Sequence, residues 1–354
     1  MRRAKTLLNN KDTLKTELLA TPIRDLELDI QRSFFEPCIQ KALEDVKHFG
    51  VNLEPTFYLS DEYGCMEGTT NIGIGFWDAD KLLREILRET KDIYRDEGTI
   101  LRLIKHEIGH AFCYGFKLYR LKEFRTTFCV EGHFFNTYPD NDRYRWDPWS
   151  MNYVNPEGDF YAQKHPDDDF AETFATFTDP AGSWKVQYRG RKGVMNKLKF
   201  VREAIRTFGR KKPLVTNGRK SLDITAGEID ETVGEFFKVS PNRYAAGADG
   251  YMDPELKSIF KVRVGARRKA LLSWQLLYRY RKFIEKTVAS QSRCRDRRII
   301  ADIITKIRSR LKALKLVYVP EEEDKTLAML TSLILLKTVC FNQFGTFKLM
   351  TRKS

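Results

Sequence analysis

Two histidines and a glutamate stand close together in residues 101–112, which read LRLIKHEIGHAF. On an α-helix successive residues advance by about 100°, so His106, Glu107 and His110 share one face. The opposite face is apolar and holds Ile100, Ile104, Ile108, Ala111 and Phe112. Two neutral imidazoles one turn apart can bind zinc, and the adjacent carboxylate can take a proton from a zinc-bound water. The segment therefore predicts a metal site on a helix whose other face is buried.

A second group of acidic residues occurs in residues 161–177, YAQKHPDDDFAETFATF. Pro166 suits the first turn of a helix, and the acids at 167–169 would be stabilised there by the helix dipole alone. However, Asp168 and Glu172 are four residues apart and share a face. A zinc site with two histidines needs a third protein ligand, and the remaining carboxylate can bind the other ring nitrogen of a histidine. The residues themselves leave open whether Asp168 or Glu172 is the ligand.

HEIGH followed by HPDDDFAETFA resembles the zinc-binding metallopeptidases of the gluzincin clan, whose second motif reads HPxEDxAETxA. The layout is also similar to lethal-factor and titration-factor type gluzincins, in which a tyrosine precedes the glutamate ligand by seven residues, as Tyr161 precedes Asp168. The resemblance covers about residues 35–180. It implies that Asp168 is the third ligand and Glu172 the supporting acid.

The chain departs from the family in having the shorter aspartate where the family has glutamate. Three explanations follow: the two helices approach more closely, Glu172 is the true ligand, or metal binding is weaker.

These motifs predict a zinc metallopeptidase that hydrolyses a peptide or protein substrate. Zinc would be held by His106, His110 and either Asp168 or Glu172, and Glu107 would be the general base. By the resemblance, Tyr161 would donate a hydrogen bond to the oxyanion that forms during hydrolysis. Residues 71–77, NIGIGFW, are predicted to form an edge strand along which an extended peptide pairs.

The surrounding pattern predicts an α+β, zincin-like domain with a small mixed sheet and an HExxH helix. Apolar spacing indicates helices at 34–49, 82–94 and 99–115, and strands at 55–60 and 71–77. Asp78 or Asp80 is expected to cap the second helix. Residues 116–160 show no sustained period, as binding-site loops often do. His133 lies among them and is interpreted as a structural histidine rather than a ligand.

Positive charge is concentrated towards the C-terminus. The net charge is +14, but residues 1–188 hold 24 Lys+Arg against 32 Asp+Glu, whereas residues 256–315 hold 19 against 3. Residues 189–220 are also basic, with 12 Lys+Arg against 1 acid. We expect an N-terminal arm (1–33), a zincin-like domain (34–188) and a basic, mostly α-helical C-terminal region (189–354), with helices at 194–208 and 223–237 and two more within 256–317.

Such basic stripes suit an anionic partner, which can be a nucleic acid, an anionic membrane surface or an acidic protein, although a solvated helix face is the more common explanation. They support an alternative function: a non-enzymatic protein that binds such a partner, with a structural or vestigial metal site. Salt-dependent binding would favour it. The aromatic residues among the arginines at 274–283 are interpreted as core side chains.

The remaining features indicate a cytoplasmic protein. The first thirty residues contain no apolar run typical of a secretory signal. Residues 327–336 are apolar but too few to span a membrane, so a buried helix is expected and no transmembrane segment. Six cysteines without a CxxC pair argue against a zinc ribbon or a disulfide scaffold and indicate a reducing compartment.

Overall fold

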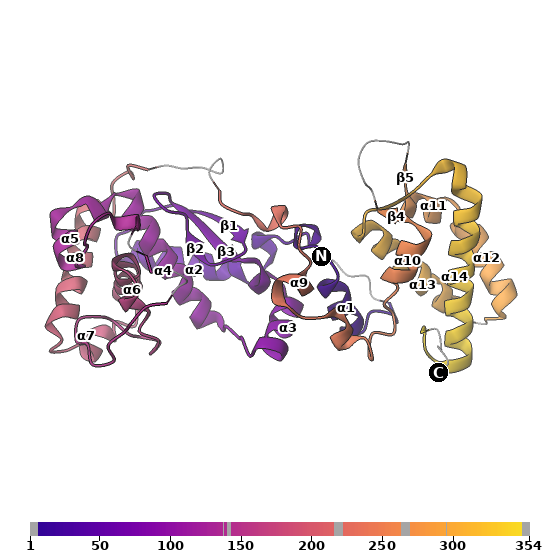
Figure 1. Ribbon diagram of the computed structural model, residues 1–354, viewed down its shortest axis with the longest axis horizontal. Helices are drawn as coiled ribbons and strands as arrows, with labels where there is room; N and C mark the ends of the chain where they lie inside the picture. The colour runs from indigo at the N-terminus through magenta and orange to yellow at the C-terminus, as the bar shows by residue number, and fades with distance from the viewer. Residues whose placement is uncertain are drawn as a thin grey trace. The chain divides into compact units, whose positions relative to one another are not determined.

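The chain divides into two compact units, which we call the middle unit and the terminal unit (Figure 1). The middle unit is Leu28–Glu228, and the terminal unit combines Met1–Glu27 with Ile229–Ser354. The computed structural model describes residues 6–136, 138–139, 143–215, 222–262, 270–294 and 296–348 of the chain. Residues 1–27 of the expected N-terminal arm group with the C-terminal region, whereas residues 28–33 and the basic helix at 192–208 belong to the middle unit.

A small mixed sheet lies in the middle unit, as the sequence predicts. Its strands are β1 (Thr56–Ser60), β2 (Gly64–Cys65) and β3 (Asn71–Gly75), in the order β1-β3-β2. β3 runs parallel to β1 and antiparallel to β2. The prediction that NIGIG forms an edge strand is therefore wrong, because β3 is paired on both sides and all five of its residues are buried.

Glycine is needed within β3 because side chains of β1 occupy the adjacent space. A Cβ on Gly73 would lie 2.9 Å from the Cβ of Ser60, closer than real Cβ contacts. The short strand β2 is the edge of this sheet on the side that contacts α4.

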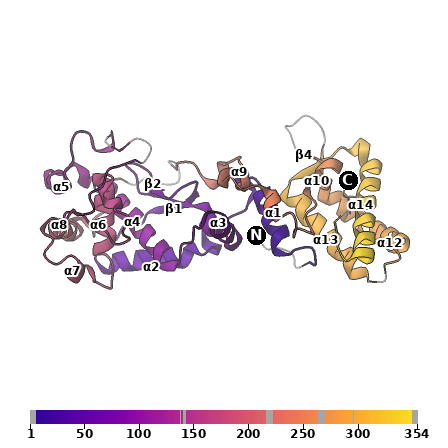
Figure 2. The ribbon, with the colours of Figure 1, turned by 60° about the horizontal axis from the view of Figure 1, so that its bottom comes forward.

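One central helix organises the middle unit. α4 (Glu97–Gly115) packs against α2 (Phe35–His48), α6 (Pro166–Phe177) and strands β2 and β3 (Figure 2). Its N-cap is Asp96, whose carboxylate accepts from the Thr99 N–H at 2.8 Å. The five apolar residues predicted to face inward are at most 1% exposed. The predicted burial of this helix is confirmed.

The remaining helices of the middle unit surround these elements. They are α3 (Lys81–Lys91), α5 (Lys122–Thr127), α7 (Trp184–Gln187) and α8 (Lys192–Phe208). Asp80 caps α3, whereas Asp78 is buried and accepts from the Tyr63 hydroxyl at 2.8 Å. α8 packs on α6 through an apolar face that includes Val194, Leu198 and Val201.

Helices of different lengths and a second small sheet make up the terminal unit. Its helices are α1 (Lys11–Leu19), α9 (Val233–Phe237), α10 (Asp253–Ile259), α11 (Ser273–Arg279), α12 (Arg281–Ser292), α13 (Arg297–Ala313) and α14 (Glu323–Phe344). The antiparallel strands β4 (Lys261–Val262), β6 (Leu316–Tyr318) and β5 (Leu271–Leu272) pair in that order.

Two predicted features of this region are wrong. A continuous helix at 223–237 is replaced by a 3₁₀ turn at Ala226–Glu228 and by α9, because Thr232 and Glu235 form a capping box that starts a new helix. The described residues of 256–317 hold strands, the end of α10 and the helices α11, α12 and α13, rather than two helices. Arg293 ends α12 in the left-handed conformation. The pairing of β4 and β5 with β6, and the left-handed residue after α12, interrupt the helical spacing of apolar residues on which the prediction of two helices rested.

The last helix is longer than its apolar run. By length and composition alone, Pro320–Phe344 is the one helix among the described residues that could cross a membrane. Leu330, Leu333 and Ile334 lie in the core of the terminal unit, and Lys337 is buried with its Nζ 2.7 Å from Glu255.

Positive charge is concentrated in the terminal unit, which has 32 Lys+Arg against 17 Asp+Glu, compared with 30 against 31 in the middle unit. The interpretation of the nearby aromatics as core residues is wrong for Tyr278 and Phe283, which are 70% and 55% exposed. Trp274 is partly buried, and the Lys312 ammonium lies over its ring, 4.5 Å from the ring centre.

Within the terminal unit, buried charges join α1, α10 and α13. The Arg310 guanidinium donates two hydrogen bonds to Asp253, at 2.9 and 2.6 Å, and Lys306 lies 2.6 Å from Glu17. All four side chains are at most 5% exposed. Each charge depends on its partners, because an unpaired charge in such a place is costly.

Replacing Arg310 with Met should therefore lower the free energy of unfolding by about 3–5 kcal/mol, since it leaves the Asp253 carboxylate buried and unpaired. Urea denaturation would measure this loss. The control is Arg308→Met on the exposed side of the same helix, which should change stability by less than about 0.5 kcal/mol. Equal effects of the two substitutions would contradict the role of the buried pair.

Candidate metal centre

Four polar side chains form a stripe along α4 at intervals of four residues. They are Arg102, His106, His110 and Tyr114, and both histidines are at most 6% exposed. This spacing places them on one side of the helix, and each of the four contacts a carboxylate of α6. α4 is otherwise closely packed, since every residue from 104 to 115 is buried.

The carboxylates are positioned by the first turns of α6. His165 is the N-cap, and its Nδ1 accepts from the Asp167 N–H at 3.1 Å. Pro166 follows at the first position of the helix, as predicted. The His165 ring also stacks on Tyr138, with the ring centres 3.7 Å apart, which fixes the start of the helix beside α4.

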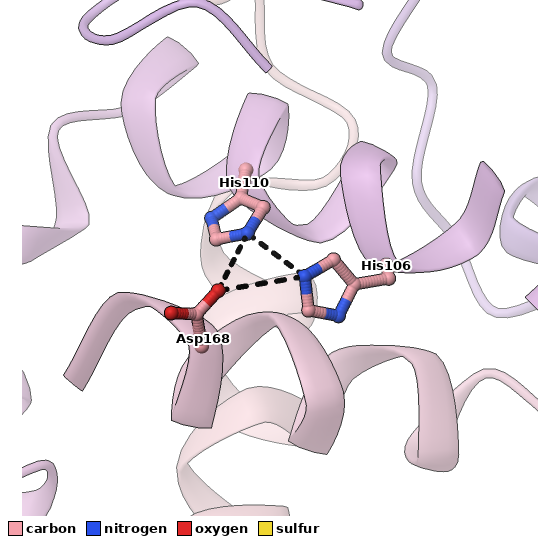
Figure 3. A group of neighbouring side chains, drawn as sticks. All are labelled: His106, His110 and Asp168. Carbon is pink, nitrogen blue, oxygen red and sulfur yellow. Dashed lines mark hydrogen bonds and ion pairs between the residues drawn. The ribbon is translucent and has the colours of Figure 1, made fainter. Parts of the chain in front are cut away.

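Three side chains direct one donor atom each toward a common point (Figure 3). His106 Nε2 and His110 Nε2 are 3.0 Å apart, and Asp168 Oδ1 lies 3.7 and 3.6 Å from them. A point equidistant from the three atoms is about 2 Å from each, the length of zinc–nitrogen and zinc–carboxylate bonds. The donor set and its geometry therefore fit a zinc ion. We call the three side chains the metal group and the point between their donor atoms the metal point.

The short aspartate reaches this point because α4 and α6 are in close contact. A Cβ on Gly109 would lie 3.0 Å from the Cα of Ala171 and 3.2 Å from the Cβ of Phe174. Only glycine lets the two backbones approach so closely without displacement. Of the three explanations for the aspartate, close approach is the one that the packing favours.

Glu172 occupies a different position from Asp168. Its Oε1 lies 2.7 Å from Nδ1 of His106, the nitrogen that faces away from the common point. Its Oε2 accepts a hydrogen bond from Arg102, and Arg102 Nε is 3.1 Å from Glu157. Glu172 thus lies on the far nitrogen of the histidine, the place that supporting carboxylates take at zinc sites.

Asp167 lies at ion-pair distance from the second histidine. Its Oδ1 lies 2.9 Å from His110 Nδ1, and its Oδ2 accepts hydrogen bonds from the hydroxyls of Tyr114 and, at 2.8 Å, Tyr138. Each histidine therefore has a carboxylate on the nitrogen opposite the metal point. Both imidazoles are held with Nε2 directed at that point.

The third acid of the run has a separate role. Asp169 is 1% exposed, and its Oδ2 lies 2.6 Å from Lys197 Nζ of α8. The three acids thus have three different partners, so stabilisation of the helix N-terminus alone does not account for them.

Burial and charge shift the pKa values of the site in opposite directions. Burial lowers the pKa of His106, but Asp168 and Glu172 outweigh burial and raise it to about 9. Burial also lowers the pKa of His110, and Asp167 and Asp168 raise it well above its usual range. The carboxylates therefore favour the protonated imidazoles when no metal is bound, and a zinc ion would compete with these protons.

The carboxylates show the complementary effect. Burial raises the pKa of Asp168 and Glu172, but the histidines, and Arg102 for Glu172, hold both values below the usual range. Burial raises the pKa of Glu107 despite the two histidines beside it. The site thus contains two carboxylates whose pKa values are lowered and a third, Glu107, that binds a proton more readily.

The structure also places three other residues considered in the sequence analysis, Glu107, Tyr161 and His133. Glu107 is 5% exposed, and its Oε2 makes no hydrogen bond among the described residues. The same is true of Asp168 Oδ2. The Tyr161 ring centre is 5.7 Å from that of His106. His133 is exposed and is not part of the metal group.

Sequence reasoning missed Arg102, Asp167, Tyr114 and Tyr138. A signal for two of them is present, because Arg102 and Tyr114 continue the four-residue spacing of the histidines along α4. Tyr138 carries no such signal, since it comes from a loop that the fold brings to Asp167.

Zinc affinity should separate the two carboxylates on α6. Asp168→Asn should remove a ligand and abolish stoichiometric zinc binding, whereas Glu172→Gln should weaken binding by about 10–100-fold, as expected for a supporting group. Competition with a chromophoric chelator would measure both constants. A larger loss for Glu172→Gln would instead assign the ligand role to Glu172.

One comparison with known proteins gives a match. Residues 57–190 match a protein family described as "Putative zinc-binding metallo-peptidase". No curated protein and no solved structure matches the chain. The matched residues run from β1 to beyond α7 and include both helices of the metal group. This part of the chain therefore resembles that zinc-binding peptidase family in sequence, and it carries a buried His-His-Asp group that suits the metal.

Proposed function

We propose that this protein is a zinc metallopeptidase that hydrolyses peptide bonds. The observation that carries the proposal is the convergence of His106 Nε2, His110 Nε2 and Asp168 Oδ1 on one point, beside a buried Glu107. The match of residues 57–190 to a zinc-binding peptidase family supports it.

His106, His110 and Asp168 would hold the ion, and Glu172 and Asp167 would keep the two imidazoles in place. A bound zinc ion would supply Lewis-acid chemistry, polarising water and the scissile carbonyl. Glu107 takes a proton from the attacking water and returns it to the leaving amine. Its burial suits this exchange, because burial raises its affinity for a proton.

Tyr161 would donate a hydrogen bond to the oxyanion that forms at the scissile carbonyl. Its ring lies beside His106, and it stands seven residues before Asp168. This spacing supports kinship with lethal-factor type gluzincins, which is part of the proposal. We expect an extended peptide to pair along β2, the edge strand that contacts α4.

Glu107→Gln should retain zinc and lower kcat by at least about a hundredfold, because glutamine cannot accept the proton. The test measures zinc content and the cleavage of a pool of fluorescence-quenched peptides by the same preparation. The matched control is Glu131→Gln, an exposed carboxylate of the middle unit, which should leave both values unchanged.

Unchanged hydrolysis by Glu107→Gln would remove Glu107 as the general base. A zinc-loaded wild type that cleaves no peptide in the pool would contradict the proposed function itself.

A further inference from the structure

The ammonium group of Lys164, three residues after Tyr161, contacts the phenol oxygen of Tyr161. Tyr161 is the first residue of the 3₁₀ turn Tyr161–Gln163, and Lys164 directly follows the turn. In such a turn, side chains three residues apart are on the same side. The Lys164 N–H donates to the Tyr161 carbonyl at 3.0 Å, and Lys164 Nζ donates to the Tyr161 hydroxyl oxygen at 3.3 Å. The same ammonium is 5.1 Å from the centre of the Tyr161 ring.

The turn is held in place on both sides of Tyr161. Phe160, which precedes it, has a left-handed backbone with φ of 60°, and its ring stacks on Trp146 with 4.7 Å between the ring centres. Gln163 accepts from the Asp147 N–H at 2.8 Å and donates to the Asp147 carbonyl at 3.0 Å. A residue with positive φ, a ring stack and two hydrogen bonds therefore fix the geometry of the Tyr161–Lys164 pair.

The chemistry of the two groups decides which way the phenol proton points. A lysine ammonium has three donors and no acceptor, so the Tyr161 oxygen must accept the hydrogen bond from Lys164. The phenol proton then has to point away from Lys164. A hydrogen bond from a cation also polarises the O–H group and makes it a stronger donor.

We propose that Lys164 is a positioning residue for Tyr161: its ammonium orients the phenol proton toward the substrate's oxyanion and strengthens the hydrogen bond that Tyr161 donates there. This inference rests on the proposed peptidase function. It adds a cation, supplied by the chain, next to the atom on which negative charge develops during hydrolysis.

The experiment is a double-mutant cycle on the zinc-loaded full-length protein. The variants are Lys164→Met, Tyr161→Phe and the double variant, with Lys164→Arg as the conservative change. Lys199→Met, an exposed lysine on α8, is the control and should keep wild-type activity. Cleavage of the peptide pool gives kcat and KM, and chelator competition gives zinc affinity.

We expect Lys164→Met to lower kcat about tenfold and Tyr161→Phe about a hundredfold, with KM and zinc affinity within about twofold of wild type. Lys164→Arg should recover most of the activity, because arginine also donates. In the Tyr161→Phe background the lysine substitution should change kcat by less than about twofold, since the group through which it acts is gone.

A second readout does not depend on activity. In metal-free protein with tyrosine labelled at ¹³Cζ, the Tyr161 resonance, identified by its absence from Tyr161→Phe, should shift at constant pH in Lys164→Met and not in Lys199→Met. An unshifted resonance would show that the ammonium does not act on the phenol and would overturn the inference.

If the wild type is active and Lys164→Met lowers kcat by the same factor with and without the Tyr161 hydroxyl, this inference is overturned and the proposed function is left intact. A zinc-loaded wild type without hydrolytic activity would overturn both.

Discussion

The packing of α4 against α6 is the contact on which the rest of the site depends. A stripe on α4 with a period of four residues faces carboxylates at 167, 168 and 172 of α6. Arg102 meets Glu172, His106 meets Glu172 and Asp168, and His110 meets Asp168 and Asp167. Burial makes this arrangement obligatory, because an ionised carboxylate without a partner is strongly destabilised inside a protein.

The distance between the two helices determines which carboxylate faces the metal point. Gly109 and Ala171 allow the backbones to approach until the two-carbon side chain of Asp168 is long enough. Glu172, one turn later and one methylene longer, then extends past the ligand atoms to the far nitrogen of His106. The same helix spacing thus accounts for the aspartate in the second motif and for the contact of the glutamate with the far nitrogen of His106.

Much of the metal group is predictable from the sequence, because residues four apart on a helix share a face whatever the tertiary structure. That rule brings His106 and His110 to one face of α4 and Asp168 and Glu172 to one face of α6, and the metal group contains the first three of these residues. It also predicts the burial of the opposite face of α4. It does not decide between Asp168 and Glu172, because that choice depends on the distance between two helices. The spacing rule does not identify Tyr138 and Lys197, since these residues contact α6 from other parts of the chain.

The errors in the fold have the same origin. β3 carries an apolar pattern that suits an edge or a central strand equally, and only pairing with the two-residue strand β2 makes it central. The helix expected at 223–237 is lost to a local capping box. Residues 1–27 group with residues 229–354 through contacts between residues far apart in the chain. Local patterns contain no information about such contacts.

The central claim is that His106, His110 and Asp168 bind one zinc ion. A crystal of the zinc-loaded protein, with diffraction measured on both sides of the zinc absorption edge, tests this claim most directly. The structure predicts one anomalous peak about 2 Å from His106 Nε2, His110 Nε2 and Asp168 Oδ1. The absence of a peak there, or a peak bound by other side chains, would contradict it.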